Sequence, residues 1–304
     1  MRSSLGSRLA PALVRALPFA WLAVFFLVPF LIVVKISLSD AVSAQPPYRP
    51  VLDWGASLAG WRDFLLALDG QNFATLLGDD LYWRSALSSL RIAAFSTILL
   101  LLAGYPVAYA MARAPDAWRP VLVALVILPF WTSFLIRVYA WIGILRPDGF
   151  LNQALMGLGL VSQPLQVLYT ETAVHLGIVY AYLPFMILPL YATLQGLDPS
   201  LTEAAEDLGA PPWKAFWTVT VPLSWPGIVA GSLLCFIPIV GEFVIPDLLG
   251  GSETLMIGRT LWSEFFSNRD WPLAAAIAVA MLALLVTPIV LFREAEERRS
   301  RSEP

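Results

Sequence analysis

Few side chains in this sequence can bind a metal ion or start a covalent reaction. The 304 residues include one cysteine, Cys235, and one histidine, His175. These residues exclude an internal disulfide, a cysteine cluster and a multi-histidine metal site. Lysine occurs only at Lys35 and Lys214, and neither is followed by Ser or Thr, so the phosphate-binding pattern GxxxxGK[ST] is absent. The sequence therefore predicts no catalytic residue, no metal and no cofactor, and any ATP that drives this protein must be hydrolysed by another chain.

Charged side chains are also scarce. They make up 13% of the chain, whereas hydrophobic residues make up 58%, and the mean hydropathy is +0.72. A soluble domain has about 25% charged and about 45–50% apolar residues. The net charge of −3 adds little, because the placement of charges matters more than their sum. The composition predicts an all-α polytopic membrane protein.

Six apolar runs are long enough to cross about 30 Å of hydrocarbon as helices. We expect these transmembrane spans, which form a membrane domain over residues 17–292, at about 17–38, 86–111, 121–145, 173–194, 227–247 and 273–292. Two prolines, Pro184 and Pro189, should break the fourth span, and Pro238 should kink the fifth. The fifth also contains GIVAG, a small-xxx-small pattern suited to close helix packing.

The first apolar run admits two interpretations. Basic residues precede it, and Val42-Ser43-Ala44 could be the cleavage site of a signal peptide. The run is long for a signal peptide, so we favour an uncleaved first helix. The loop that follows, 39–84, is polar with aromatics, and we expect short helices in it, for example around 57–68.

An even number of spans places both termini on one side of the membrane. If residues 1–16 and 293–304 are cytoplasmic, the inside segments hold ten Lys and Arg residues, and the longer outside segments hold six. This distribution satisfies the positive-inside rule, so we expect cytoplasmic termini. The outside segments then hold twelve acidic and six basic residues, so their net charge is negative. This charge can attract cations or a basic docking surface, and the alternative is that it only keeps the loops solvated.

One polar, strongly patterned segment, 198–222, lies between the fourth and fifth spans. Asp198 before a proline predicts a helix start, and Ser200 and Glu203 have the spacing of a capping box. An apolar stripe at helical spacing comprises Leu201, Ala204, Ala205 and Leu208. Gly209 predicts the helix stop, and a second short helix can begin at Pro212. The residues expected on one side of this second helix are Trp213, Phe216 and Trp217.

The spacing of this segment resembles the cytoplasmic coupling loop of ABC-importer permeases. That pattern is EAA, three residues, Gly, nine residues and I-x-L-P. Here it reads Glu203-Ala204-Ala205, Gly209 and Val219-Thr220-Val221-Pro222, with valine at both hydrophobic positions. The resemblance implies that the loop, Phe216 included, docks into a cleft on an ATPase subunit, with Glu203 holding it by hydrogen bonding and Gly209 giving the turn. The alternative is an amphipathic loop lying on the membrane surface.

Four ionisable residues fall inside the predicted spans: Arg91, Arg137, His175 and Glu242. Charges there are costly and are usually functional or paired. Arg137 and Glu242 have similar predicted depths, so we expect them to be near neighbours or to face a common aqueous path. Arg91 is close enough to the surface to snorkel, and His175 is expected to be interfacial or packed rather than part of a site.

Two further stretches combine aromatic and charged residues: 128–141 reads LPFWTSFLIRVYAW, and 241–251 reads GEFVIPDLLGG. Carboxylates beside Trp and Tyr suit an ammonium ligand through ion pairing and cation–π contact, whereas the alternative is an aromatic interface belt with ordinary core packing. With the coupling loop, these stretches resemble the spermidine/putrescine permeases, and among them the first of the two permease subunits. The same branch contains importers of other small organic solutes.

This resemblance implies a type I importer fold of six helices in the bacterial cytoplasmic (inner) membrane. It implies a heterodimer with a second related permease, two ATPase subunits that bind the ATP, and a periplasmic or lipid-anchored binding protein that delivers the substrate. Membrane lipid is an expected partner, and nucleic acid is not. Transport would proceed by alternating access. The residues expected along the substrate pathway are Trp131, Arg137, Tyr139, Trp141, Glu242, Asp247 and Glu264.

Three other functions compete with this one. A secondary transporter or channel would need an inverted repeat or a coupling-ion carboxylate deep in the membrane, and Glu242 is the only acid well inside a predicted span. An intramembrane enzyme is hard to assemble from one histidine, one cysteine and no carboxylate pair at mid-depth. The third alternative keeps the importer and changes its cargo to an amino-acid derivative, a phosphonate or an opine.

Overall fold

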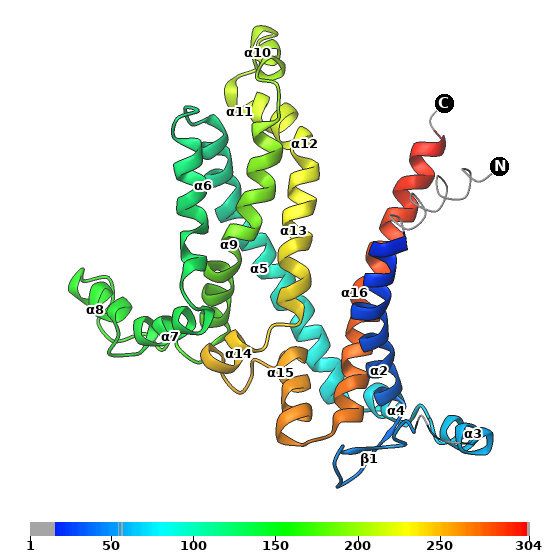
Figure 1. Ribbon diagram of the computed structural model, residues 1–304. Coiled ribbons are helices and arrows are strands. Elements are labelled where there is room, and N and C mark those ends of the chain that lie inside the picture. Colours follow the sequence, from blue (N-terminus) through cyan, green and yellow to red (C-terminus); the bar gives the residue numbers. More distant parts are fainter. Residues whose placement is uncertain (1–15, 54, 56, 303–304) are drawn as a thin grey trace, which may run out of the picture. The chain divides into compact units, whose positions relative to one another are not determined.

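The structure, a computed structural model, describes residues 16–53, 55 and 57–302 (Figure 1). It divides into two units. The first comprises the chain up to Trp83 together with the chain from Leu261 onward, and the second runs from Arg84 to Thr260. Helices α5 (Asp80–Arg113) and α15 (Ile257–Trp262) contribute residues to both units. The expected N-terminal segment 1–16 lies outside the described residues except for Ala16.

The first unit is built on two long helices. One runs from Ala16 to Ser37 and contains η1 (Ala23–Leu27), a stretch of π-helix, and α2 (Val28–Ser37). The other is α16 (Trp271–Ser302), which packs along α2 (Figure 1). Twenty-two residues span about 33 Å at about 1.5 Å per residue, which is enough to cross a bilayer. In the most apolar part of the first helix no residue is fully buried within this chain, so most of its surface is left to other molecules.

Between these helices the first unit has small elements only. Strands β1 (Asp40–Ala41) and β2 (Tyr48–Arg49) pair antiparallel, and helices α3 (Leu58–Leu66), α4 (Gln71–Gly78) and η4 (Ser263–Ser267) complete it. The Ser57 hydroxyl accepts a hydrogen bond from the Gly60 N–H, so the helix expected around 57–68 is confirmed, and Ser57 is its N-cap. The Asn72 amide donates to the carbonyl oxygens of Ser37 and Ser39, which ties α4 to the end of α2.

The second unit is entirely helical in its described residues. Its remaining elements are α6 (Arg119–Ile127), η2 (Leu128–Trp131), α7 (Phe134–Leu145), α8 (Phe150–Gly157), α9 (Glu171–Gln195), α10 (Ser200–Asp207), α11 (Pro212–Ala215), η3 (Phe216–Thr220), α12 (Val221–Leu223), α13 (Trp225–Val240) and α14 (Val244–Leu249). Helix α9 is the most enclosed of them, and α13 lies directly along it (Figure 1).

Two glycines allow α13 to approach α9 closely. A Cβ atom on Gly227 would lie 2.6 Å from the Thr193 hydroxyl oxygen and 3.1 Å from the Pro189 carbonyl oxygen. A Cβ atom on Gly231 would lie 2.9 Å from the Met186 sulfur. The expectation that GIVAG is a close-packing face is therefore confirmed.

Three of the expected spans need correction. The span expected at 121–145 is broken at Thr132 and Ser133, and its two parts are bent by 86°. Pro129 lacks an amide N–H, and Thr132 turns to an extended conformation, so the helix cannot continue. The span expected at 227–247 ends at Val240, before α14. Conversely, α9 is not broken at its two prolines and remains one helix from Glu171 to Gln195. Membrane helices tolerate such prolines where neighbouring groups compensate for the lost backbone hydrogen bond.

The number of spans follows from how the bent pairs are counted. Three helices of the described residues are long and apolar enough to cross a membrane: Ala16–Ser37, Asp80–Arg113 and Glu171–Gln195. Two bent pairs, one around the break at 132–133 and one at 64° between Leu223 and Trp225, bring the number to five. The apolar part of α16, Trp271–Thr287, is shorter than these.

Replacing Gly227 by Leu should lower the thermal unfolding temperature, because the new side chain meets Thr193 and the backbone of α9. Overpacking of this kind costs about 1–3 kcal/mol. Gly143→Leu is the matched control, since a Cβ atom at Gly143 in α7 has no neighbour within 4 Å. Equal unfolding temperatures of the two purified variants in detergent would contradict the packing described.

Candidate functional site

The segment 198–222, which we call the elbow, consists of α10, α11, η3 and α12. At its start, the Asp198 carboxylate accepts a hydrogen bond from the Ser200 N–H at 3.0 Å, and this bond lowers the pKa of Asp198. The carboxylate thus supports the helix start that the sequence predicts, although α10 proper begins at Ser200. Among the described residues the Glu203 carboxylate has no hydrogen-bond partner, so the expected reciprocal capping by Ser200 and Glu203 does not form.

Gly209 forms the sharp turn of the elbow. Its φ is +87°, in the left-handed region that favours glycine. The Gly209 N–H donates to the Glu206 carbonyl oxygen at 2.8 Å, and the Ala210 N–H donates to the Ala205 carbonyl oxygen at 3.1 Å. These two bonds make a Schellman motif, which ends α10 as the sequence predicts.

The elbow leaves large apolar side chains uncovered. Leu208 is 91% exposed, Trp213 is 69% exposed and Trp217 is 62% exposed. Phe216 instead points into the second unit, where its ring lies 5.7 Å from that of Tyr105 and 5.4 Å from that of Tyr109. The Phe216 ring also lies edge-on to Trp217 at 5.3 Å, so it contacts one of the tryptophans expected beside it while packing on the two rings of α5.

The other expected coupling residues remain accessible. Glu203, Ala204 and Pro222 are exposed, and Ala205 is half-buried. Behind the start of α10 lies a cavity of about 310 Å³, and its lining includes Arg113, Arg119, Leu194, Asp198, Thr202 and Thr220. The elbow therefore rests on α5 through Phe216, while the start of α10 stands over unfilled space.

Glu242 lies in the break between α13 and α14 and is only 8% exposed. One carboxylate oxygen accepts the N–H groups of Val244 and Ile245 at 3.0 and 3.4 Å, and the other accepts the Tyr182 hydroxyl at 2.6 Å. The carboxylate thus caps α14 and fastens it to α9. A buried carboxylate needs such donors, because an unpaired one would be very costly.

Arg137 does not pair with Glu242. Its guanidinium carbon lies 5.3 Å from the ring centroid of Phe130, and the described residues hold no ion pair between the two charges. A series of aromatic contacts connects them instead: Phe130 lies 5.1 Å from Phe185, and Phe185 lies 6.0 Å from Tyr182, which bonds Glu242. The alternative expectation, that both charges face a common aqueous path, stays a prediction.

The remaining pathway candidates lie in different surroundings. Trp131 is 82% exposed and Tyr139 is 58% exposed, whereas Trp141 packs edge-on against Tyr180 at 5.5 Å. Asp247 forms an ion pair with Arg259 at 3.1 Å. These residues belong to the second unit with Glu242, but Glu264 belongs to the first.

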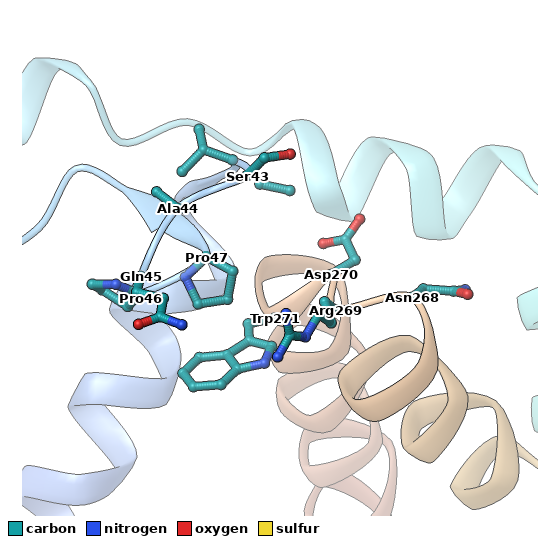
Figure 2. Close-up of a pocket in the computed structure, with 11 residues that line it drawn as sticks. Ser43, Ala44, Gln45, Pro46, Pro47, Asn268, Arg269, Asp270 and Trp271 are labelled. Atoms are coloured by element: carbon teal, nitrogen blue, oxygen red, sulfur yellow. The ribbon is translucent and has the colours of Figure 1, made fainter.

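In that first unit the Glu264 carboxylate is buried and accepts the Tyr82 hydroxyl at 3.2 Å and the Asn268 amide at 2.8 Å. Nearby lies a cavity of about 880 Å³. Figure 2 shows the residues that line it, which come from the segments 41–47 and 268–271. Its lining includes Arg269 beside Asp270, so it does not favour ions of one sign.

A polar network joins α5 and α9, and no spacing in the sequence predicts it. Arg91 bonds Glu171 at 2.6 Å, Glu171 lies 3.4 Å from His175 Nε2, and His175 Nδ1 lies 2.8 Å from the Ser96 hydroxyl. His175 is packed, as expected, whereas Arg91 pairs across helices rather than only reaching for the surface. The order Ser, His, Glu is that of a nucleophile and its base, but Ser96 is fully buried, so no substrate can reach it.

Known proteins resemble this chain in sequence and in fold. Residues 12–302 match the family described as binding-protein-dependent transport system inner membrane component. The chain is 37% identical, over 94% of both chains, to the spermidine/putrescine transport system permease protein PotB of Haemophilus influenzae. It is 40% identical to PotB of Escherichia coli, over 73% of this chain and 80% of that one. A crystal structure of a bacterial alginate ABC transporter in complex with alginate pentasaccharide-bound periplasmic protein has the same fold, with a TM-score of 0.68, 17% identity and coverage of 97% and 96%.

These matches define a membrane-spanning transport component with the permease fold of type I ABC importers. The chain belongs to the family of binding-protein-dependent transport system inner membrane components, and it is a multi-pass protein of the inner membrane. It is a permease subunit and not an enzyme, and separate subunits hydrolyse the ATP.

Replacing Tyr182 by Phe should lower the unfolding temperature, because the buried Glu242 carboxylate loses a charge-assisted donor, at a cost of about 1.5–3 kcal/mol. Tyr180→Phe on the same helix is the control, since the ring that packs against Trp141 is kept. Thermal unfolding of both purified variants measures the difference, and equal stabilities would argue against the assigned hydrogen bond.

Proposed function

We propose that this chain is the transmembrane permease subunit of an ATP-driven importer that moves putrescine and spermidine into the cytoplasm. The observation that carries the proposal is the elbow: a Gly209 turn at φ +87° presents Leu208, Trp213 and Trp217 to a partner. Two relatives that cover most of this chain are named for spermidine and putrescine transport, which supports this cargo.

The proposed arrangement in the membrane has six spans with both termini cytoplasmic. Three straight helices, two bent pairs and α16 supply the six. The greater number of Lys and Arg residues on the elbow side supports the orientation, because basic loops stay in the cytoplasm. In this orientation the elbow faces the compartment that contains ATP.

The proposed partners are a second, related permease, two ATPase subunits and a periplasmic or lipid-anchored binding protein. Uncovered tryptophan and leucine side chains on the elbow support a docked protein there, since large exposed apolar patches mark interfaces. The largely exposed apolar surface of the helix Ala16–Ser37 supports contact with lipid or with another membrane helix.

Helix α13 offers a mechanical route from the elbow to Glu242. Its start follows the elbow after the 64° bend, and the Ser224 and Tyr105 hydroxyls are hydrogen-bonded there at 2.8 Å. Its other end leads into the break that holds Glu242, about 24 Å away for 16 residues at about 1.5 Å each. In the proposed cycle, displacement of the elbow by the ATPase subunits moves α13 and opens the contact between Tyr182 and Glu242.

The chemistry of the pathway candidates fits a cationic cargo. Glu242 and Asp247 supply carboxylates on either side of the start of α14, and Trp141 supplies an aromatic ring in the same unit. An ammonium group binds such a combination through ion pairing and cation–π contact. Both carboxylates already have donors, so a cationic substrate would compete with Tyr182 for Glu242 and with Arg259 for Asp247.

Uptake of radiolabelled putrescine by cells that produce the complete transporter should fall when unlabelled spermidine is added. An amino-acid derivative, a phosphonate or an opine in the same excess should leave uptake unchanged, because none of them is a compact polycation. Competition by one of these solutes, with none by spermidine, would identify that solute as the substrate. Uptake that continues without ATP hydrolysis would indicate a secondary transporter.

Replacing Glu203 by Lys should reduce uptake at least about tenfold, which corresponds to about 1.4 kcal/mol of docking free energy. The exposed carboxylate lies on the proposed ATPase-facing side, so charge reversal weakens docking without unfolding the bundle. Glu253→Lys, which reverses another exposed charge away from the elbow, is the control. Membrane fractions must contain both variants in wild-type amounts. Normal uptake by Glu203→Lys would contradict the coupling role.

A further inference from the structure

Arg137 carries a charge for which the described residues provide no acceptor. Its Nε and Nη1 atoms are buried and have no hydrogen-bond partner. The rings of Phe130 and Phe134 lie 5.3 and 5.8 Å from the guanidinium carbon, which is cation–π distance. A buried charge with no counter-charge is costly, and a cation–π contact offsets only part of that cost. The side chain is only half-buried, so another molecule can still reach the charge through Nη2.

The carboxylates of the second unit near the helix breaks are already engaged. Glu242 accepts three hydrogen bonds, from Tyr182, Val244 and Ile245. Asp247 is paired with Arg259. Among the described residues no ion pair involves Arg137, so a counter-charge from another chain would find it unoccupied.

The surface beside Arg137 is apolar and uncovered. On η2 and α7, Trp131 is 82% exposed, Ile136 is 67% exposed and Tyr139 is 58% exposed. Lipid chains could cover these side chains but offer no acceptor, and a guanidinium that pairs with lipid instead must reach a headgroup phosphate, which the cross-linking below distinguishes from a protein partner. A protein helix that carries a carboxylate would cover the apolar side chains and neutralise the charge together.

We infer that this face of η2 and α7 is the contact surface for the second permease subunit, and that Arg137 pairs there with an Asp or Glu side chain of that subunit. The inference rests on the proposed function in one respect, since it requires a second permease. It also assigns Arg137 to an interface rather than to the lining of the pathway. A fixed positive charge repels a polyamine, whereas a paired one does not.

The first experiment locates the neighbour of this surface. The photoreactive residue p-benzoylphenylalanine replaces Ile136 in the chain, which is produced in its native host, and intact membranes are irradiated. Mass spectrometry should identify one cross-linked protein, a second permease-type chain, with the cross-link in a segment that contains Asp or Glu. Cross-links only to lipid, or to a second copy of this chain, would overturn the inference.

The second experiment tests the charge pair. Arg137→Glu should reduce the amount of the second permease that copurifies in mild detergent at least about tenfold, as expected for reversal of a buried interfacial charge. Changing the cross-linked acidic residue of the partner to Arg should restore the complex. Arg146→Glu is the matched control, because Arg146 ends the same helix, is exposed and pairs with Asp148 within this chain. This control should retain the partner.

The outcomes separate this inference from the proposed function, because copurification does not depend on the cargo. A complex that survives Arg137→Glu, or one that no partner substitution restores, overturns the charge pair. Rescue by Glu242→Arg within this chain also overturns it, since the pair would then be internal. An unsubstituted complex that copurifies but takes up no putrescine, together with restored copurification of the charge-swapped pair, would support the interface and reject only the polyamine cargo.

Discussion

The hydrogen bond between the Tyr182 hydroxyl and the Glu242 carboxylate joins α9 to the break between α13 and α14. A carboxylate this deeply buried requires donors, and the break between α13 and α14 supplies two amides to one oxygen while α9 supplies the phenol to the other. The direction of α14, and with it the position of Asp247, follows from this arrangement. Helix α13 runs from the elbow to the break that holds Glu242. The contact between Tyr182 and Glu242 therefore lies at the end of α13 that is next to the candidate pathway.

The sequence was sufficient to predict the elements that local chemistry determines. Gly209 is at the helix stop because a left-handed turn disfavours residues with a Cβ atom, and the small residues of GIVAG are at the contact between α13 and α9 because larger ones do not fit. The fold class follows from hydropathy, since long apolar helices satisfy their own backbone in a bilayer. The sequence alone therefore predicts the helix–turn–helix of the elbow and the apolar helices.

Hydropathy could not predict where helices bend or which charges meet. It records the length of an apolar run but not its direction, so it does not predict the 86° bend at Thr132 and Ser133. The two prolines of α9 predict a break that does not occur. The contacts of Arg91 with Glu171 and of Ser96 with His175 join residues about eighty positions apart, and no local spacing signals them. Depth alone suggested that Arg137 and Glu242 are neighbours, but aromatic rings link them instead of an ion pair.

The cavity of about 310 Å³ behind α10 has a mechanical consequence. Under the proposed function, a force on α10 acts across this open cavity, whereas a force on Phe216 acts directly on Tyr105 and Tyr109 of α5. The displacement of α13 that a docked partner causes then depends on which part of the elbow the partner pushes.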